Sequence, residues 1–257
     1  IFHAIRDLAK QTGERLYWSH AETVIISRSL AEEGILPIID FLARDQKTRF
    51  SMFLYVSDRK MAKDVFQAKD VPSENVSYFL ADLKGIKNTI PEYPTATIKR
   101  FAMDVNEEGV EPLVPVVCTI ENNGENIPNI KGSMAFKGDK AVGYLNEVDT
   151  KTVLLIKDEV GGGVFVHTIH GEKETDKLTL EIFKNKTRII PRYVDGEVII
   201  EIKINTNIAV GEMMGDIEVT TEKEHLALKE RIEKEVEKQC ERTIKKVQKE
   251  YGSDIFG

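Results

Sequence analysis

The sequence predicts a multidomain protein of mixed α/β (α+β) class, with N-terminal helix-on-sheet units and a C-terminal antiparallel sheet wrapped around one long helix. Residues 1–66 alternate between helical and strand-like apolar patterns, an order that favours helices packed on a sheet. Residues 164–208 hold strand-like runs separated by turns, and residues 222–251 hold one long amphipathic pattern. The two halves of the chain therefore differ in character.

Length and this change of pattern set the predicted domains. At 257 residues the chain suits one large domain or two to three small ones, and it can bury a sizeable core. We divide it into an N-terminal α/β region, residues 1–148, and a C-terminal region, residues 149–257, whose long helix covers residues 222–251. Within the first region we expect two subdomains with a break near residues 67–73, where Val71-Pro72 interrupts the alternation.

The elements of the first region follow from apolar spacing and turn residues. An opening helical stripe ends at Gly13, which accepts a left-handed backbone, and Asp58 stands where a helix cap is expected. Gly138-Asp139 has the composition of a hairpin turn. The predicted order is a helix over residues 2–9, a strand over 16–27, a helix around 38–42, a strand over 50–56, helices over 61–66, 76–83 and 98–105, a strand over 114–120, and a hairpin of 131–136 with 140–145.

The second region is predicted from period-two alternation. The last strand alternates most clearly, because Val198, Ile200, Ile202 and Ile204 fall on one face. Ile199 interrupts the polar character of the other face, so we expect part of that face to be covered as well. The predicted elements are a short helix over residues 151–156 and strands over 164–171, 178–184 and 197–208.

One amphipathic helix is predicted to close the chain. Thr221 and Glu224 have the spacing of a capping box at its N terminus. Most of its apolar residues recur every four positions, which overshoots the 3.6-residue turn, so the stripe winds around the helix. A winding stripe suits a helix that lies in a curved antiparallel sheet. The apolar positions are Leu228, Ile232, Val236, Cys240, Ile244, Val247 and Tyr251.

Composition and motif spacing exclude several functions. The net charge of −7 and the pI near 5.4 argue against nucleic-acid binding, which needs Lys and Arg to neutralise phosphates. No apolar run is long enough to span a bilayer. Cys118 and Cys240 are expected to be packed thiols, and Gly161–Gly163 precede a strand rather than a phosphate-binding helix. His3 with Asp7 and Glu222 with His225 have helical spacing, but two ligands make no metal site without a third, and no HExxH motif occurs. We predict no cofactor, no metal site and no catalytic residue.

The densest charged group in an otherwise apolar helix is formed by Asp40, Arg44 and Asp45. Asp40 and Arg44 are i,i+4 neighbours, the spacing of a helical ion pair. Asp40 and Asp45 lie about 140° apart around a helix, which is poor geometry for an acid–base pair of carboxylates. We therefore predict a partner contact or a helix-end brace at these three residues rather than catalysis.

Three separated segments carry a family resemblance. They are Asp40-Phe-Leu-Ala-Arg-Asp45, the run of residues 132–145 that contains Ala135-Phe136-Lys137 and Val142-Gly143, and the closing Tyr251-Gly-Ser-Asp-Ile-Phe-Gly257. In this order and at these separations the chain resembles the C subunit of bacterial spore germinant receptors, the Ger(x)C lipoprotein family. The resemblance extends over nearly the whole chain.

The resemblance implies a function without catalysis. Proteins of this family are similar to a three-domain α/β structure and have no known enzymatic activity. They are lipoproteins, made with a diacylglycerol on an N-terminal cysteine, and lie on the outer face of the inner spore membrane. With membrane-embedded A and B subunits they sense nutrients that trigger germination. Since neither Cys118 nor Cys240 lies in a lipobox, we expect this chain to be a soluble ectodomain fragment whose lipid-bearing cysteine lies outside it.

Two further hypotheses remain open at this point. The chain is alternatively a module that binds the germinant small molecule directly in an interdomain cleft, which predicts a concave pocket with converging polar groups. The third hypothesis, a hydrolase, requires a nucleophile, a base and an orienting group within hydrogen-bond reach. No spacing in the sequence indicates such a set.

Overall fold

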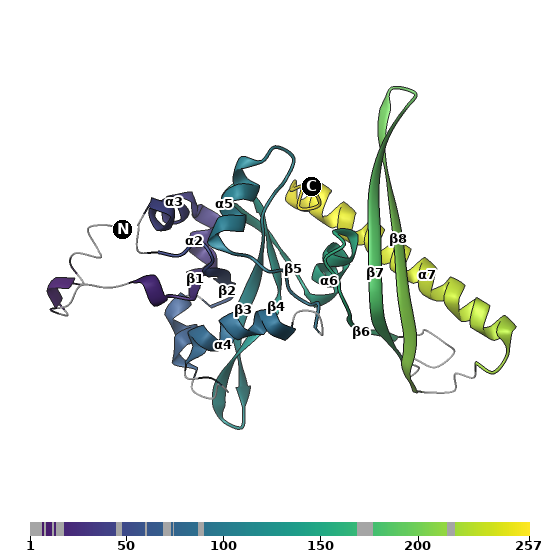
Figure 1. The fold of residues 1–257 in the computed structure, drawn as a ribbon, viewed down its shortest axis with the longest axis horizontal. Coiled ribbons are helices and arrows are strands. Elements are labelled where there is room, and N and C mark those ends of the chain that lie inside the picture. Colours follow the sequence, from purple (N-terminus) through teal and green to yellow (C-terminus); the bar gives the residue numbers. More distant parts are fainter. Residues whose placement is uncertain are drawn as a thin grey trace.

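Two β-sheets and one long helix organise the computed structural model, which describes residues 7, 9–11, 13, 18–44, 48–59, 61–68, 73, 75–86, 90–168, 177–214 and 219–257. Within these residues one sheet has the order β1-β2-β3-β4-β5 and the other the order β6-β7-β8. The sheets lie side by side along an elongated molecule, with helix α6 between them (Figure 1). The mixed α/β (α+β) class predicted from the sequence is confirmed.

The first sheet combines parallel and antiparallel pairing. Strands β1 (Thr23–Ser27), β2 (Phe53–Ser57) and β3 (Leu113–Asn122) are parallel neighbours, and helices connect them. Strands β4 (Glu125–Lys137) and β5 (Lys140–Leu145) then add on in antiparallel fashion. The predicted hairpin at Gly138-Asp139 is present, and Gly138 has a φ of 56°. Positive φ at this turn explains the glycine.

Helices cover both faces of the first sheet. Side chains alternate along β2, so Leu54 and Val56 face one cluster while Tyr55 faces the other. Helices α2, α3 and α5 cover the first cluster, and η2 and α4 cover the second. These elements are η1 (Trp18–His20), α2 (Arg28–Glu33), α3 (Leu36–Arg44), η2 (Ala62–Gln67), α4 (Val76–Asp82), η3 (Leu83–Ile86) and α5 (Ile98–Asn106).

The N-terminal predictions needed four corrections, the first being that the strand expected over residues 50–56 is β2, which begins only at Phe53. The strand expected over residues 16–27 is confined to β1, because β2 provides partners only for residues 23–27, and Trp18–His20 form a 3-10 turn. The helix expected after Asp58 is the 3-10 helix η2, which begins after Met61 without a side-chain cap. Helix α2 was not predicted, because a helix of six residues has less than two turns and its apolar periodicity is too short to recognise. The opening stripe at residues 2, 5 and 8 lies outside the described residues.

The second sheet is antiparallel and contains a long hairpin. Strands β6 (Gly163–Thr168), β7 (Lys177–Val194) and β8 (Glu197–Met214) pair in sequence. Both strands are longer than predicted: β7 continues through Asn185 and Pro191, which resemble loop residues in the sequence, and β8 continues past residue 208 to Met214. Pro191 is compatible with β7 here, since β6 pairs only with residues 177–182 and the far edge of β7 is unpaired at Pro191.

One long helix packs on the second sheet, as predicted. Helix α7 (Glu222–Lys245) begins with the expected capping box of Thr221 and Glu224, and continues into the π-helical turn η4 (Lys246–Tyr251). Its Leu228 and Ile232 pack against β7, while its far end reaches the first sheet (Figure 1). The helix therefore spans both sheets.

Helix α6 (Glu147–Ile156) is the shared core of the molecule. It starts four residues earlier than predicted, because Asn146 caps it by accepting a hydrogen bond from the backbone N–H of Asp149 at 2.8 Å. Every residue from 149 to 156 is buried. Val153 packs with Leu145 of the first sheet, whereas Leu154 packs with Ile182 of the second.

Candidate functional site

The charged group predicted as a contact site lies on the surface of helix α3. Arg44 Nε donates to Asp40 Oδ1 at 2.8 Å, and the two side chains are 76% and 52% exposed. Asp45 lies outside the described residues. A pair so exposed contributes about 1 kcal/mol or less to the stability of the fold, so its groups remain available for another partner. The role of these three residues as a contact stays a prediction.

The start of helix α3 is fixed by the turn between β4 and β5. Asp139 Oδ2 accepts a hydrogen bond from the backbone N–H of Leu36 at 3.0 Å, and the Asp139 carbonyl accepts from Ile35 N–H at the same distance. These bonds satisfy backbone donors at the helix N terminus, where a negative charge is favourable. Gly34 lies against the Asp139 carboxylate and has a φ of 123°. The hairpin thus positions the helix that carries Asp40 and Arg44.

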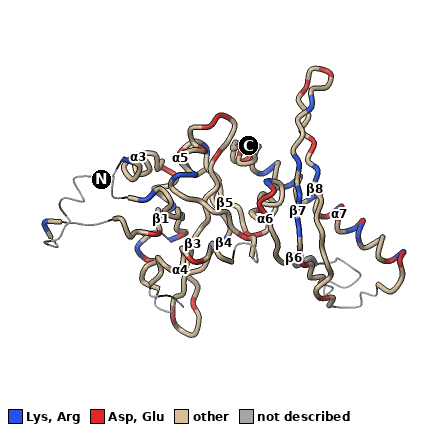
Figure 2. The backbone as a smooth tube through the Cα atoms, viewed as in Figure 1, with Lys and Arg blue, Asp and Glu red and all other residues tan. Residues whose placement is uncertain are grey.

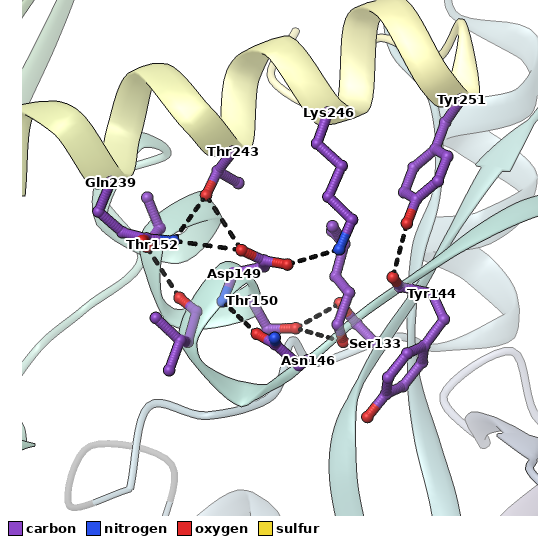
Figure 3. A network of polar contacts seen from close by, with 12 residues as sticks. Ser133, Tyr144, Asn146, Asp149, Thr150, Thr152, Gln239, Thr243, Lys246 and Tyr251 are labelled. Atoms are coloured by element: carbon purple, nitrogen blue, oxygen red, sulfur yellow. Dashed lines mark hydrogen bonds and ion pairs between the residues drawn. The ribbon is translucent and has the colours of Figure 1, made fainter.

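The closing segment of the chain packs on the same hairpin. Tyr251 Oη donates to the Tyr144 carbonyl at 2.7 Å (Figure 3), and Ser253 Oγ donates to the Phe136 carbonyl at 2.6 Å. Gly143 leaves the space that the Tyr251 ring fills, since a Cβ at this position would overlap the ring. The β4–β5 hairpin therefore brings together the three segments that carry the family resemblance, which sequence spacing alone did not reveal.

A buried polar network joins α6 to the C-terminal helix (Figure 3). The Asp149 carboxylate accepts from Lys246 Nζ at 2.7 Å, from Gln239 Nε2 at 3.2 Å and from Thr243 Oγ1 at 3.4 Å. Burial lowers the pKa of Lys246, but the hydrogen bond and charge of Asp149 outweigh it, so the pKa is raised overall. Lys246 therefore remains an ammonium at neutral pH, and the network holds an ion pair.

Neighbouring polar groups extend this network into both sheets. Thr150 Oγ1 and Ser133 Oγ of β4 are 2.8 Å apart. Lys151 Nζ donates to the Val164 carbonyl at 2.8 Å and to Glu92 Oε1 at 3.2 Å, and lies over the Phe165 ring. These residues of α6 were not predicted as part of a polar network. Asn146 followed three residues later by Asp149 is a helix-start signal that indicates where the helix begins.

The candidate reactive side chains considered in the described part of the chain are the cysteines, the histidines and possible metal ligands. Among them, no group of three His, Cys, Asp or Glu residues has the geometry to hold a metal ion. Cys118 and Cys240 are free and buried, and burial raises the pKa of both thiols, that of Cys240 to about 11. His225 lies in a shallow hollow at the start of α7, whereas the side chain of His167 and all of His170 lie outside the described residues.

Two of the open hollows in the described part of the chain have the following linings. One lies at the N terminus of α7 and is lined by Thr221, His225 and Leu226. The other lies beside β1 and is lined by Ile26, Leu30 and other apolar residues. Neither lies between the two sheets, where the direct-binding hypothesis places its cleft.

In the described residues, no helix is both long and apolar enough to cross a membrane.

Family models match almost the entire chain. A model described as the spore germination protein N-terminal domain matches residues 1–118, and one described as spore germination B3/GerAC like, C-terminal, matches residues 131–257. The chain belongs to the Ger(x)C family of spore germination proteins. The resemblance inferred from the three sequence segments is therefore confirmed.

Individual Ger(x)C relatives and one solved structure agree with this assignment. Spore germination protein KC of Bacillus subtilis (strain 168) is 22% identical over 97% of this chain and 65% of its own length. Spore germination protein B3 of the same strain is 25% identical over 99% of this chain and 67% of its own length. The crystal structure of the GerBC protein matches with a TM-score of 0.70 and 22% identity, covering 96% of this chain and 70% of that chain. The chain spans 59–67% of the length of the curated relatives that it matches.

Proposed function

We propose that the full-length protein is a lipid-anchored, non-catalytic subunit of a nutrient germinant receptor on the outer face of the inner spore membrane. Its task is receptor assembly or signalling that triggers germination. The observation that carries this proposal is the match of two spore germination family models over residues 1–118 and 131–257. The names of the relatives, spore germination proteins KC and B3, support the same process.

The proposed lipid is attached to a cysteine outside the 257 residues. Cys118 lies in the interior of β3 and Cys240 packs on the inner side of α7, and both thiols are buried. A buried thiol with a raised pKa is a poor nucleophile for the alkylation that joins a diacylglyceryl group to sulfur. A diacylglyceryl group places two acyl chains in the bilayer, which is enough for stable anchoring, so contacts with the membrane-embedded A and B subunits are expected to set the position and orientation of the protein rather than its attachment.

The contact with the A and B subunits is proposed to include Asp40, Arg44 and Asp45. The exposed groups on α3 can exchange their mutual ion pair for bonds to a partner at little cost to the fold. Arg44 carries a planar fork of donors, which suits bidentate recognition of a partner carboxylate. The rigid attachment of α3 to Asp139 would present these groups in one orientation.

Co-purification of the full-length lipidated protein from spore membranes tests both proposals. Wild-type protein is expected to recover two multi-span partners, and recovery without any multi-span partner would contradict the receptor proposal. The double variant Asp40→Ala/Arg44→Ala is expected to lower recovery several-fold with an unchanged thermal melt. The matched control is Arg28→Ala/Glu32→Ala, which removes another exposed i,i+4 pair, at 2.8 Å on helix α2. Equal recovery with both double variants would contradict the proposed contact at α3 and would leave the receptor proposal unaffected.

A further inference from the structure

The β7–β8 hairpin projects well beyond the helix that covers its base (Figure 1). We call residues 188–203 the arm. Along the arm the two strands pair only with each other, because the pairing of β6 with β7 involves residues 177–182. The turn at its end has positive φ at Asp195 and Gly196, 52° and 89°, the pattern of a tight two-residue turn. The arm is therefore a well-defined two-stranded ribbon.

The two faces of the arm differ in chemistry. Cross-strand partners project on the same side of a ribbon, so successive pairs alternate between its faces. One side, which we call the apolar arm face, consists of the pairs Ile189–Ile202, Pro191–Ile200 and Tyr193–Val198. On the opposite side Glu201 bonds to Arg192 at 2.6 Å and to Lys203 at 3.0 Å. The second side thus carries the charged residues of the arm together with Ile190, Val194 and Ile199, whereas the apolar arm face carries no charged residue.

The apolar arm face is uncovered in the described chain. Tyr193 is 76%, Val198 68% and Ile200 52% exposed. Nearer the body the same face is part of the core: Thr187 is buried and bonded to the Leu155 carbonyl at 2.7 Å, and Ile204 packs on the cluster of Leu154 and Ile182. The arm face thus continues into a covered lower half, where the polar residues Asn185 and Thr187 form buried hydrogen bonds and α6 and α7 pack on the apolar residues beyond them.

We propose that the apolar arm face docks an amphipathic α-helix of a partner protein. This inference rests on the proposed function, because it assigns a second contact surface to a docking subunit. The intramolecular interface shows which partner the face accepts: α7 packs on its lower half through Leu228, Ile232 and Val236, which are four residues apart. A partner helix with the same spacing extends this interface along the arm, in the manner of helix-in-groove recognition.

Two other occupants fit the arm less well. A second copy held by this face alone would use six residues, whereas a stable interface of standard size involves roughly 20–30 residues a side, and a partner helix within a receptor complex does not depend on this face alone. A lipid bilayer would meet Asp195 and Glu197 at the extremity of the arm, where Figure 2 shows acidic residues. Burying carboxylates in hydrocarbon is costly, and anionic headgroups repel them.

Site-specific photo-crosslinking tests the proposal in the full-length protein. A benzoylphenylalanine residue replaces Ile200 on the apolar arm face in one strain, and Ile199 on the charged face in the control strain. The positions are adjacent and similarly exposed, at 52% and 48%. After irradiation of spores, the cross-linked peptides are identified by mass spectrometry. We expect position 200 to yield at least about fivefold more product than position 199, joined to a peptide with apolar residues every three to four positions.

Each other outcome overturns the arm proposal. Cross-links to another part of the same polypeptide, to a second copy or to lipid assign the face to that occupant, and equal yields from both positions remove the face preference. The outcomes also separate this proposal from the receptor assignment. An amphipathic helix in a protein that is not a multi-span receptor subunit supports the arm and contradicts the receptor. Co-purification of the receptor subunits without a helix cross-link at position 200 supports the receptor assignment and contradicts the arm proposal.

A pair of mild variants gives an independent readout. Ile200→Thr and Ile199→Thr both keep a β-branched residue that favours strands. Ile200→Thr is expected to lower the cross-link yield from a photoreactive residue at the neighbouring face position 198 about tenfold, and Ile199→Thr less than twofold. Circular dichroism of both variants checks that the fold is retained. Equal effects of the two substitutions would contradict a docking face.

Discussion

At the scale of single residues, Asp149 shows how burial and charge combine in this protein. Its carboxylate is surrounded by donors from α7 and η4, namely Gln239, Thr243 and Lys246, and its side chain is only 9% exposed. A buried ion pair adds little net stability when both partners are present, since desolvation offsets attraction. Removal of one partner, by contrast, leaves a charge without compensation. We therefore expect Asp149 to fix the position of the C-terminal helix more than to add net stability.

Substitution of Lys246 tests this asymmetry. Lys246→Met is expected to lower the free energy of unfolding by about 2–3 kcal/mol, because Asp149 loses its cation while it stays buried. The matched control is Lys245→Met, which removes an exposed pair with Glu241 at 3.4 Å and should change stability by about 0.5 kcal/mol or less. Urea denaturation measures both. The double variant Asp149→Asn/Lys246→Met should recover part of the loss, and no recovery would contradict a charge effect.

The two thiols allow a pH-dependent prediction at the same scale. Burial raises the pKa of Cys240 to about 11, compared with about 8.5 for a free thiol. At about pH 8, roughly one Cys240 in a thousand is therefore a thiolate in the folded state, against roughly a quarter when unfolded. Labelling with a disulfide reagent is expected to be at least a hundredfold slower for the native protein than in concentrated guanidinium chloride.

The sign of the linked stability effect follows from the same shift. Because the folded thiol holds its proton to higher pH than the unfolded thiol, its contribution to stability is complete below about pH 8.5 and is lost as the pH rises toward 11. The free energy of unfolding should therefore decline over this range. Rapid native labelling at about pH 8 would show that the thiols are accessible and would contradict the prediction.

At the scale of elements, the β4–β5 hairpin organises three distant segments of the chain. Asp139 at its turn holds the start of α3, while Phe136 and Tyr144 accept hydrogen bonds from the closing segment. The absence of a side chain at Gly143 provides the space for the Tyr251 ring. These contacts explain physically why Asp139, Gly143 and Tyr251 occur in the segments that carry the family resemblance.

Substitution of Gly143 tests the fit of η4 on the hairpin. Gly143→Ala places a Cβ where the Tyr251 ring lies, so the ring and its bond to the Tyr144 carbonyl must shift. We expect a loss of about 1–3 kcal/mol in the free energy of unfolding, the usual cost of overpacking. Gly85→Ala is the control, since a Cβ there meets no atom within 4 Å, and it should be neutral or slightly stabilising. Thermal denaturation that does not distinguish the two variants would contradict the packing role.

The elements that the sequence predicted well have local signals. The capping box at Thr221 and the turn at Gly138-Asp139 are short-range patterns, and both are present in the structure. The predictions failed where contacts with residues distant in the sequence decide where an element begins or ends. The strand over residues 16–27 was shortened by the limits of β2, and the start of α3 is completed by Asp139, about a hundred residues away. The mutual contacts of the motif segments are tertiary, so no local pattern contains them.

At the scale of the whole molecule, helix α6 joins the two sheets. Val153 belongs to the cluster with Leu145 and Val247, on the side of the first sheet, and Leu154 to the cluster with Ile182 and Val236, on the side of the second. The division predicted at residues 148 and 149 falls within this helix and stays a prediction. Because one buried helix contributes to both cores, we expect the two sheets to unfold in a single transition.

Truncation of Leu154 tests this coupling. Leu154 is fully buried, and Leu154→Ala is expected to lower the free energy of unfolding by about 2–5 kcal/mol. If α6 couples the sheets, native-state hydrogen exchange should lose protection in β2 and β3 of the first sheet as much as in β7 of the second. Leu226→Ala, which truncates an exposed leucine of α7, is the control and should leave both patterns unchanged. Loss of protection confined to the second sheet would show that the sheets open independently, and α6 would then be a linker rather than a common core.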